Sequence, residues 1–222
     1  MKKLWQGLGI LLLVALVTVG CGKNPAPQNP AAQPDTNQAA QPKKQYAKAP
    51  DMQIDPNKTY RAKVSTTKGD FTIELFAKDA PKTVNNFVFL SKDKFYDNIV
   101  FHRILKTFMI QTGDPTGTGA GGPGYKFEDE LNNGHQYEPG VVAMANSGPN
   151  TNTNGSQFFI GTGADVKNLN NMPYYTIFGK VVEGMDVVEK IASTPVTTDP
   201  NSGEPSKPTE TVSIKNITIE EK

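Results

Sequence analysis

The residues that could do chemistry begin with an arginine in a mostly apolar strand pattern. The stretch Phe101–Asp114 reads FHRILKTFMIQTGD, with a bend predicted near Lys106-Thr107, and Arg103 is its fixed cation. Arginine carries a permanent charge on a rigid fork of donors. Such a cation is costly to desolvate unless it has partners. Either Arg103 lies on a surface strand and reaches water, or it is a donor held beside an apolar site.

A second stretch favours the functional interpretation. Residues 142–160 read VAMANSGPNTNTNGSQFFI. Taken together and in order, the two stretches resemble the signatures of the cyclophilins, FHR-x-x-x-x-FM-x-QGGD followed by MAN-x-G-x-NTNGSQFFI. Cyclophilins are peptidyl-prolyl cis-trans isomerases. The resemblance covers roughly residues 60–220.

The resemblance implies catalysis of rotation about X–Pro bonds. The barrier to this rotation, about 18–20 kcal/mol, comes from amide resonance. No proton is removed and no bond is broken, so the catalyst must bind the twisted amide better than the planar one. In the twisted state the proline nitrogen regains a lone pair, which a fixed cationic donor stabilises. Each tenfold acceleration needs about 1.4 kcal/mol, so one arginine and an apolar pocket could supply most of the effect.

The family resemblance also implies the role of each site residue. Arg103 matches the catalytic arginine, and His102 before it is implied to give structural support. The proline pocket is implied at Phe108, Met109 and Phe159. The substrate-binding residues also include Gln111, Ala145, Asn146 and Gln157, with Asn146 expected to pair with backbone. Without the family match, Phe108, Met109 and Phe159 read as ordinary barrel core, and Phe158, on the opposite face, is expected in the core.

The last part of the implied pocket departs from the family pattern. Tyr175 falls at a position where the family has His, and Leu169 matches the family's Leu only if a longer loop is allowed. Both are predicted to bind substrate. Asn168 or a neighbour stands where the family has Trp, which should weaken binding of cyclosporin-type ligands without removing isomerase activity. Thr112 replaces a Gly, a milder departure.

The N-terminus has the features of a signal peptide followed by a lipid-anchor site. Lys2 and Lys3 precede an apolar run over residues 8–19, which is shorter than the roughly 20 residues of a spanning helix but suits a signal peptide at 1–20. Thr18-Val19-Gly20-Cys21 resembles the lipobox of bacterial lipoproteins, although Thr18 departs from the usual leucine-like residue. An acylated Cys21 would anchor the protein on the extracytoplasmic side of a bacterial membrane. The alternative is an ordinary secretory signal with an incidental cysteine.

Residues 21–57 differ in composition from the rest of the chain. They are rich in Pro, Ala and Gln and have almost no aliphatic residues after the cysteine, so they cannot offset their own ordering entropy. We predict a disordered linker that holds the isomerase domain, residues 58–222, away from the membrane. A proline-rich ligand for another domain is the alternative.

The pattern of residues 58–222 predicts a mainly β fold. A hairpin is expected from 60–65 and 71–76, further strands at 140–146, 157–161, 175–182 and 209–219, and helices opening at 80–83 and covering 184–193. Residues 195–208 are expected to be a loop. Many short strands without repeated helical crossovers indicate an antiparallel barrel. The cyclophilin resemblance implies a closed eight-stranded barrel capped by two helices.

Several other classes are excluded or disfavoured by the sequence. One cysteine forms no internal disulfide, and the two histidines, His102 and His135, offer no zinc set. Loss of Lys2 and Lys3 would change the net charge from +1 to −1, so no nucleic acid is expected. The G-x-G-x-x-G of residues 117–122 has no following helix to hold a pyrophosphate, and no G-x-S-x-G hydrolase motif occurs. We expect no cofactor or metal, a monomer, and exported proline-containing polypeptides as partners; the alternative function is a non-catalytic proline-peptide-binding chaperone.

Overall fold

The computed structural model describes residues 44–222. The predicted signal peptide, Cys21 and most of the predicted linker lie outside this part of the chain. Within it, no helix combines the length and apolar character needed to cross a membrane.

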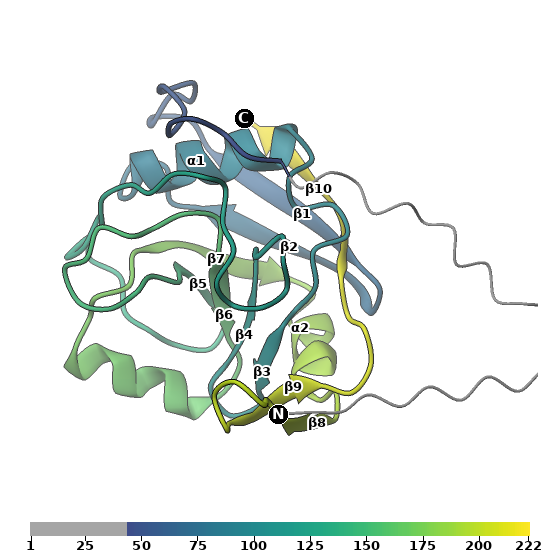
Figure 1. Cartoon of the computed structure of the whole chain (residues 1–222). Helices are drawn as coiled ribbons and strands as arrows, with labels where there is room; N and C mark the ends of the chain where they lie inside the picture. The colour runs from purple at the N-terminus through teal and green to yellow at the C-terminus, as the bar shows by residue number, and fades with distance from the viewer. Residues whose placement is uncertain (1–43) are drawn as a thin grey trace, which may run out of the picture. The chain divides into compact units, whose positions relative to one another are not determined.

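A curled antiparallel sheet dominates the fold, as Figure 1 shows. It has eight strands, so the mainly β prediction is confirmed. The strand order is β10-β1-β2-β7-β5-β6-β4-β3. Three helices and a separate two-stranded hairpin complete the domain. The strands of the sheet are β1 (Tyr60–Thr66), β2 (Gly69–Leu75), β3 (Arg103–Leu105), β4 (Met109–Thr112), β5 (Val141–Met144), β6 (Phe158–Gly161), β7 (Ile177–Glu183) and β10 (Ile214–Glu221).

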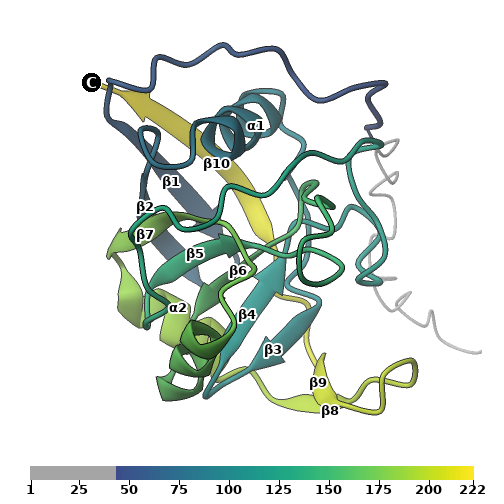
Figure 2. The same ribbon diagram turned by 90° about the vertical axis from the view of Figure 1, so that its left-hand side faces the viewer.

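The closed barrel that we predicted is wrong, because the edge strands β3 and β10 do not pair with each other. The chain just before each edge strand makes the connection instead, through an isolated bridge between Val100 and Ser213. Phe101 also donates its backbone N–H to the Val212 carbonyl, at 2.9 Å. With only three residues, β3 is too short to continue the ladder, and the sheet remains a half-barrel (Figure 2).

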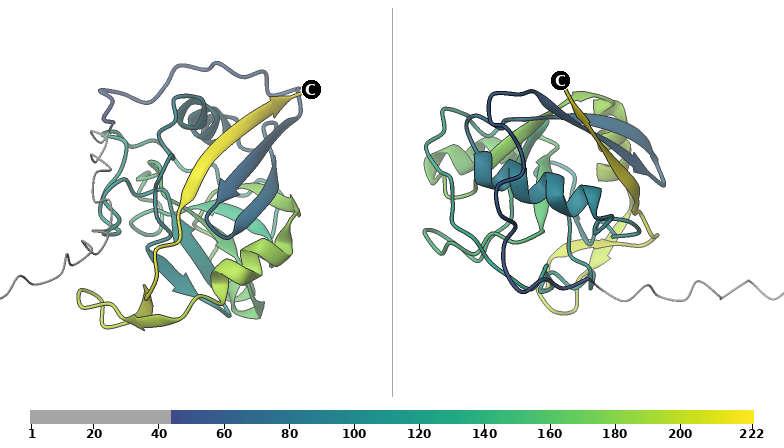
Figure 3. Two further views of the ribbon diagram at one scale, coloured as in Figure 1. Left: turned by 90° about the vertical axis from the view of Figure 1, so that its right-hand side faces the viewer. Right: turned by 90° about the horizontal axis from the view of Figure 1, so that it is seen from above.

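Helix α1 (Pro81–Lys92) covers one open end of the curled sheet, as seen from above in Figure 3. Proline begins the helix, where its missing N–H has no partner to lose. The face formed by Val84, Phe87, Val88 and Leu90 is buried. The Phe87 ring packs against Tyr96, Phe158 and Phe178, with ring centroids 5.3–5.5 Å apart. This aromatic group forms the main core.

Three other elements lie at the end of the domain away from α1 (Figure 1). Helix α2 (Met185–Ala192) confirms the helix expected over 184–193 and follows Gly184, whose φ of 77° is left-handed. A 3-10 helix spans Ala164–Asn171, where we expected a longer loop. The predicted loop 195–208 contains a hairpin of β8 (Val196–Thr198) and β9 (Pro205–Pro208).

The end of the predicted linker is ordered on the domain, which corrects the disorder expected there. Residues 44–57, here called the strap, run over α1 (Figure 2). Tyr46 packs edge-on against Phe89, at 5.2 Å, and Ile54 is buried. Gln53 donates its backbone N–H to the Asn85 side chain at 2.7 Å. The composition argument failed here because two apolar anchors and a few hydrogen bonds suffice when an existing surface receives them.

Candidate active site

Arg103 is the first residue of β3, at the edge of the sheet. Its guanidinium makes a bidentate ion pair with Glu204, with Nε–Oε2 at 2.6 Å and Nη2–Oε1 at 2.9 Å. The third nitrogen, Nη1, lies 3.4 Å from Oε1 of Gln111 and 4.0 Å from the sulfur of Met109. The Arg103 side chain is 34% exposed, so it is neither a fully solvated surface residue nor a buried charge.

A chain of polar side chains extends from Arg103 across the sheet. The β3–β4 register sets Arg103 opposite Gln111, which explains their contact. Gln111 donates from Nε2 to Oε1 of Gln157 at 2.9 Å. Gln157 in turn donates to the carbonyls of Gly119 and Gly121, at 3.0 and 2.8 Å. The chain of hydrogen bonds therefore connects the arginine to the glycine-rich loop.

An apolar cluster lies beside the arginine and is separate from the main core. It brings together six of the residues that we predicted to bind substrate, and those six are Phe108, Met109, Ala145, Phe159, Leu169 and Tyr175. Phe159 meets Tyr175 edge-on, with ring centroids 5.3 Å apart. Phe158, its neighbour in β6, belongs to the main core, as expected. Alternation along one strand thus divides two adjacent phenylalanines between core and site.

Backbone contacts hold the β3–β4 turn that carries Phe108. Thr162 donates its N–H to the Phe108 carbonyl, and Asp165 donates to the Thr107 carbonyl, both at 3.0 Å. Gly163 lies so close to the backbone of Thr107 that a Cβ at this position would collide with it. The start of the 3-10 helix therefore holds the β3–β4 turn in place, and Phe108 is fixed relative to Phe159.

The glycine-rich loop is filled by a carboxylate from its own chain. Asp114 accepts backbone hydrogen bonds from Thr116 and Gly119, each at 2.6 Å, and from Gly121 at 3.1 Å. Burial raises the pKa of Asp114, but these hydrogen bonds outweigh it and hold the pKa below the ordinary value. Because Asp114 occupies these N–H groups, they are not available to a pyrophosphate, in agreement with the exclusion of a dinucleotide site.

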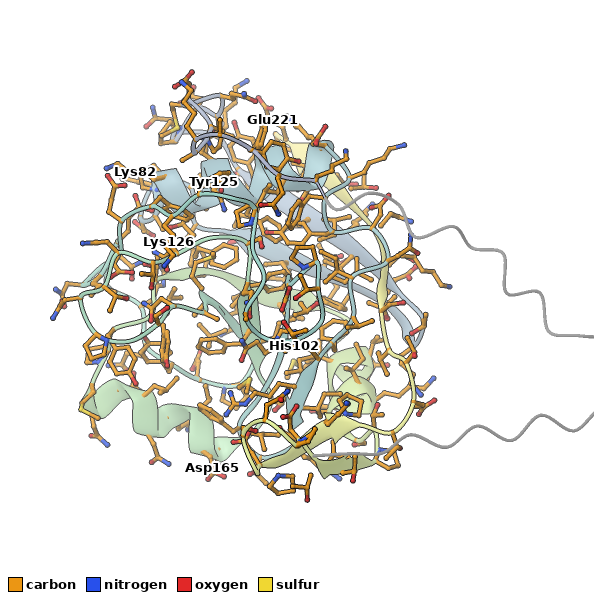
Figure 4. All side chains as sticks on the ribbon, in the orientation of Figure 1. Lys82, His102, Tyr125, Lys126, Asp165 and Glu221 are labelled. Carbon is orange, nitrogen blue, oxygen red and sulfur yellow. The ribbon has the colours of Figure 1, made fainter. Side chains whose placement is uncertain are left out.

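A cavity of about 960 Å³ lies between this loop and the chain after β5. Four predicted substrate-binding residues line it, and they are Gln111, Ala145, Asn146 and Gln157. The Asn146 amide donates to the Tyr174 carbonyl at 2.8 Å, so this side chain pairs with backbone of its own chain. Gln45 of the strap and Tyr125 also line the cavity; Figure 4 labels Tyr125 near α1.

The segment that departs from the family pattern still contributes to the apolar cluster. Tyr137 fixes Tyr175, because its hydroxyl donates to the Tyr175 carbonyl at 2.6 Å and accepts from the Tyr175 N–H at 3.0 Å. Burial raises the pKa of Tyr137 to about 12 and also raises that of Tyr175. Leu169 packs on the cluster, whereas Asn168 is exposed.

His102 lies next to the arginine and is marked near the centre of Figure 4. Its two ring nitrogens are buried and have no hydrogen-bond partner among residues 44–222. Burial lowers the pKa of His102, so the ring is neutral at pH 7 and adds no charge beside Arg103. This is consistent with the structural support that we expected.

Glu204 is the main site residue that the sequence did not indicate. It lies 101 residues after its partner, in the turn of the β8–β9 hairpin, and belongs to no recognisable motif. Among the described residues, no group of three or more His, Cys, Asp or Glu side chains could hold a metal ion.

Comparisons with known proteins identify the family of this chain. The family model described as cyclophilin-type peptidyl-prolyl cis-trans isomerase matches residues 61–219. Peptidyl-prolyl cis-trans isomerase A of Mycobacterium tuberculosis is 47% identical over 182 residues, covering 74% of this chain and 94% of that protein. Peptidyl-prolyl cis-trans isomerase-like 1 of Neurospora crassa is 52% identical over 136 residues, covering 60% of this chain and 80% of that protein.

Solved structures show the same relationship. A Cryptosporidium parvum cyclophilin-type isomerase, crystallised in the presence of the dipeptide Ala-Pro, matches with a TM-score of 0.63 and 37% identity, covering 72% of this chain and 98% of that chain. The arginine beside an apolar cluster, the family match and the shared fold lead to one conclusion. The chain belongs to the cyclophilins and is a peptidyl-prolyl cis-trans isomerase.

Proposed function

We propose that this isomerase binds the twisted X–Pro amide between Arg103 and the apolar cluster, in exported proteins. The observation that carries the proposal is the orientation of the guanidinium. Two of its nitrogens bind Glu204, while Nη1 lies near Met109 and Gln111, where the polar chain meets the cluster. An N–H donor is therefore available beside an apolar surface that can receive a proline ring.

The physical reason is selective stabilisation of the twisted state. In a planar amide the nitrogen lone pair is delocalised and accepts hydrogen bonds poorly, whereas the twisted nitrogen is a better acceptor. A preorganised cationic donor thus binds the transition state more tightly than either ground state. A charged hydrogen bond contributes about 1.5–3 kcal/mol, which corresponds to roughly 10- to 150-fold in rate.

The test is exchange spectroscopy on a proline-containing peptide. Wild-type protein should accelerate cis-trans exchange, and Arg103→Ala should reduce that acceleration more than tenfold. The matched control is Arg61→Ala, which removes the chain's other arginine, on β1, where it pairs with Glu74 at 3.5 Å. The control should retain wild-type activity. Equal activity in wild type and Arg103→Ala would show that the arginine has been misassigned.

The same experiment tests the non-catalytic alternative. A protein that only binds proline peptides would shift peptide resonances without increasing the exchange rate. Titration of wild-type protein therefore separates a chaperone module from an enzyme. Retention of Arg103, Gln111, Phe108 and Phe159 in one arrangement supports catalysis.

We further propose that the enzyme acts as a monomer on the outer side of a bacterial membrane, anchored through acylated Cys21. The support for the lipid anchor is the sequence alone, namely the apolar run that ends just before this cysteine. In a bacterial host, wild-type protein should incorporate labelled palmitate and appear in the membrane fraction, whereas Cys21→Ser should do neither. Unlabelled wild-type protein in the soluble fraction would contradict the anchor.

A further inference from the structure

We propose that Glu204 is a positioning residue for isomerisation and that it fixes the guanidinium of Arg103 in the orientation that catalysis requires. The inference deepens the function proposed above and rests on it. It concerns a residue outside the two sequence signatures, in the β8–β9 hairpin.

The ion pair restricts both the position and the plane of the Arg103 guanidinium. Glu204 binds the Nε and Nη2 edge of the guanidinium, at 2.6 and 2.9 Å. A bidentate contact of this kind fixes the plane of the fork as well as its position. Because Nε and Nη2 are occupied, Nη1 is left nearest Gln111 and Met109. A monodentate or solvated arginine would rotate about its terminal torsions and lose this orientation.

Glu204 is itself held by the hairpin. Its backbone carbonyl accepts hydrogen bonds from the N–H groups of Asp199, at 2.8 Å, and Ser206, at 2.9 Å. Ser206 is buried, and its side chain helps to lower the pKa of the Glu204 carboxylate. The hydrogen bond from Arg103 is the largest influence that lowers the pKa of Glu204, so the carboxylate is charged at neutral pH.

The β8–β9 hairpin lies close enough to β3 in space for Glu204 to reach Arg103. β9 lies beside β3, the strand that begins with Arg103 (Figure 2). The Glu204 side chain is 31% exposed, close to the 34% of its partner. A pair at this exposure contributes little to stability. Its consequence is therefore expected in the orientation of the donor, where a displacement of about 1 Å can cost up to roughly 100-fold in rate.

The ion pair could also lower the isomerisation rate, because the Glu204 carboxylate partly neutralises the charge of Arg103. If neutralisation dominated, removal of Glu204 would increase the isomerisation rate. Since a rigid donor near a neutral amide nitrogen depends on alignment more than on net charge, we expect the rate to fall.

The experiment compares Glu204→Gln with Glu210→Gln. Glu210 follows β9 and pairs with Lys68 at 2.7 Å, so the control removes the same charge from the same segment. Exchange spectroscopy at saturating peptide should show at least a roughly fivefold lower rate for Glu204→Gln. Peptide affinity should change less than about twofold, and Glu210→Gln should behave as wild type. A wild-type or higher rate for Glu204→Gln would overturn the inference.

Two further readouts distinguish positioning from a general structural role. In the Arg103→Ala background, Glu204→Gln should have no additional effect, because Glu204 acts through the arginine; an additive loss would refute this. The Nε–Hε resonance of Arg103, assigned with the help of Arg61→Ala, should be protected from solvent exchange in wild type and lose protection in Glu204→Gln. An unchanged resonance would mean that Glu204 does not hold the guanidinium.

Failure of this inference is separable from failure of the proposed function. If Arg103→Ala has wild-type activity, the proposed mechanism fails. If Arg103→Ala is impaired while Glu204→Gln is not, the arginine acts as proposed without help from the hairpin.

Discussion

Two adjacent phenylalanines in β6 offer a test of how this fold divides core from site. Phe158 is fully buried and packs on Phe87, Tyr96 and Phe178. Phe159 is 4% exposed and packs on Tyr175 in the apolar cluster. Replacing each by alanine removes the same atoms from neighbouring positions, so any difference in outcome reflects which face each ring occupies.

We expect Phe158→Ala to lower stability strongly and activity little. Truncation of a buried phenylalanine costs about 3–5 kcal/mol. For a domain of this size, each kcal/mol lowers Tm by about 2–4 °C, so the expected decrease is roughly 6–20 °C. The isomerisation rate per folded molecule should change less than about twofold. Phe158→Leu leaves a smaller cavity and replaces the alanine variant if that variant does not fold.

Phe159→Ala should instead lower the isomerisation rate. Burying one methylene group is worth about 0.8 kcal/mol. If the Phe159 ring covers one or two of the methylenes of a bound proline, its loss costs roughly 0.8–1.6 kcal/mol, which corresponds to roughly 4- to 15-fold in rate. This variant also loses an edge-on contact with Tyr175, worth about 0.5–1.5 kcal/mol, and some burial, so its Tm should fall as well.

The assay pairs thermal unfolding with exchange spectroscopy at a temperature where both variants are folded. The decisive quantity is activity per folded molecule. Equal losses of activity in Phe158→Ala and Phe159→Ala would refute the division between the two faces of β6. So would full activity in Phe159→Ala, because the apolar cluster would then not be the proline pocket.

Two other predictions concern stability. Gly163→Ala should lower stability by roughly 1–3 kcal/mol, and so lower Tm, because the added Cβ would collide with Thr107. The collision should also shift the β3–β4 turn and so lower activity. The control for thermal unfolding is Gly122→Ala, which has open space around it and should match wild type. Tyr46→Phe should lower stability at pH 7, because the Tyr46 hydroxyl donates to Asp93 at 2.5 Å and lowers the pKa of Asp93. A carboxylate whose pKa is lowered by folding stabilises the fold at pH values above its ordinary pKa, and this contribution is lost as pH falls through the lowered pKa. The difference in stability between wild type and Tyr46→Phe should therefore narrow in denaturant titrations as pH is lowered below the ordinary Asp pKa of about 4. A constant difference would contradict the linkage.

Most strands and both α-helices of the fold could be predicted from local patterns. Alternation around Phe71 and Ile73 indicates a strand, and Pro81 marks the start of α1. That the sheet stays open could not be predicted, because it depends on how segments far apart in the chain meet, and here Val100 and Ser213 form only an isolated bridge. Nor could the strap, since Tyr46 has no large apolar residue beside it in the sequence and finds its aromatic partners only on the folded surface.

The candidate site could be predicted where a motif carried it. The cluster around Met109 and Phe159 contains six of the residues that the family resemblance implied. Glu204 escaped notice because its partner is distant in sequence and its own surroundings are an ordinary turn. Tyr137 escaped for a similar reason, since its contact with Tyr175 joins two loops.

An open sheet has a further consequence for a protein of a family that binds proline-containing peptides. Its edge strands carry backbone groups that can add an extended polypeptide as a new strand. In this domain β3 is only three residues long and β9 lies beside it. A client chain therefore finds little edge to extend along on that side. On this side of the sheet, the domain can therefore meet extended polypeptides without adding them as new strands.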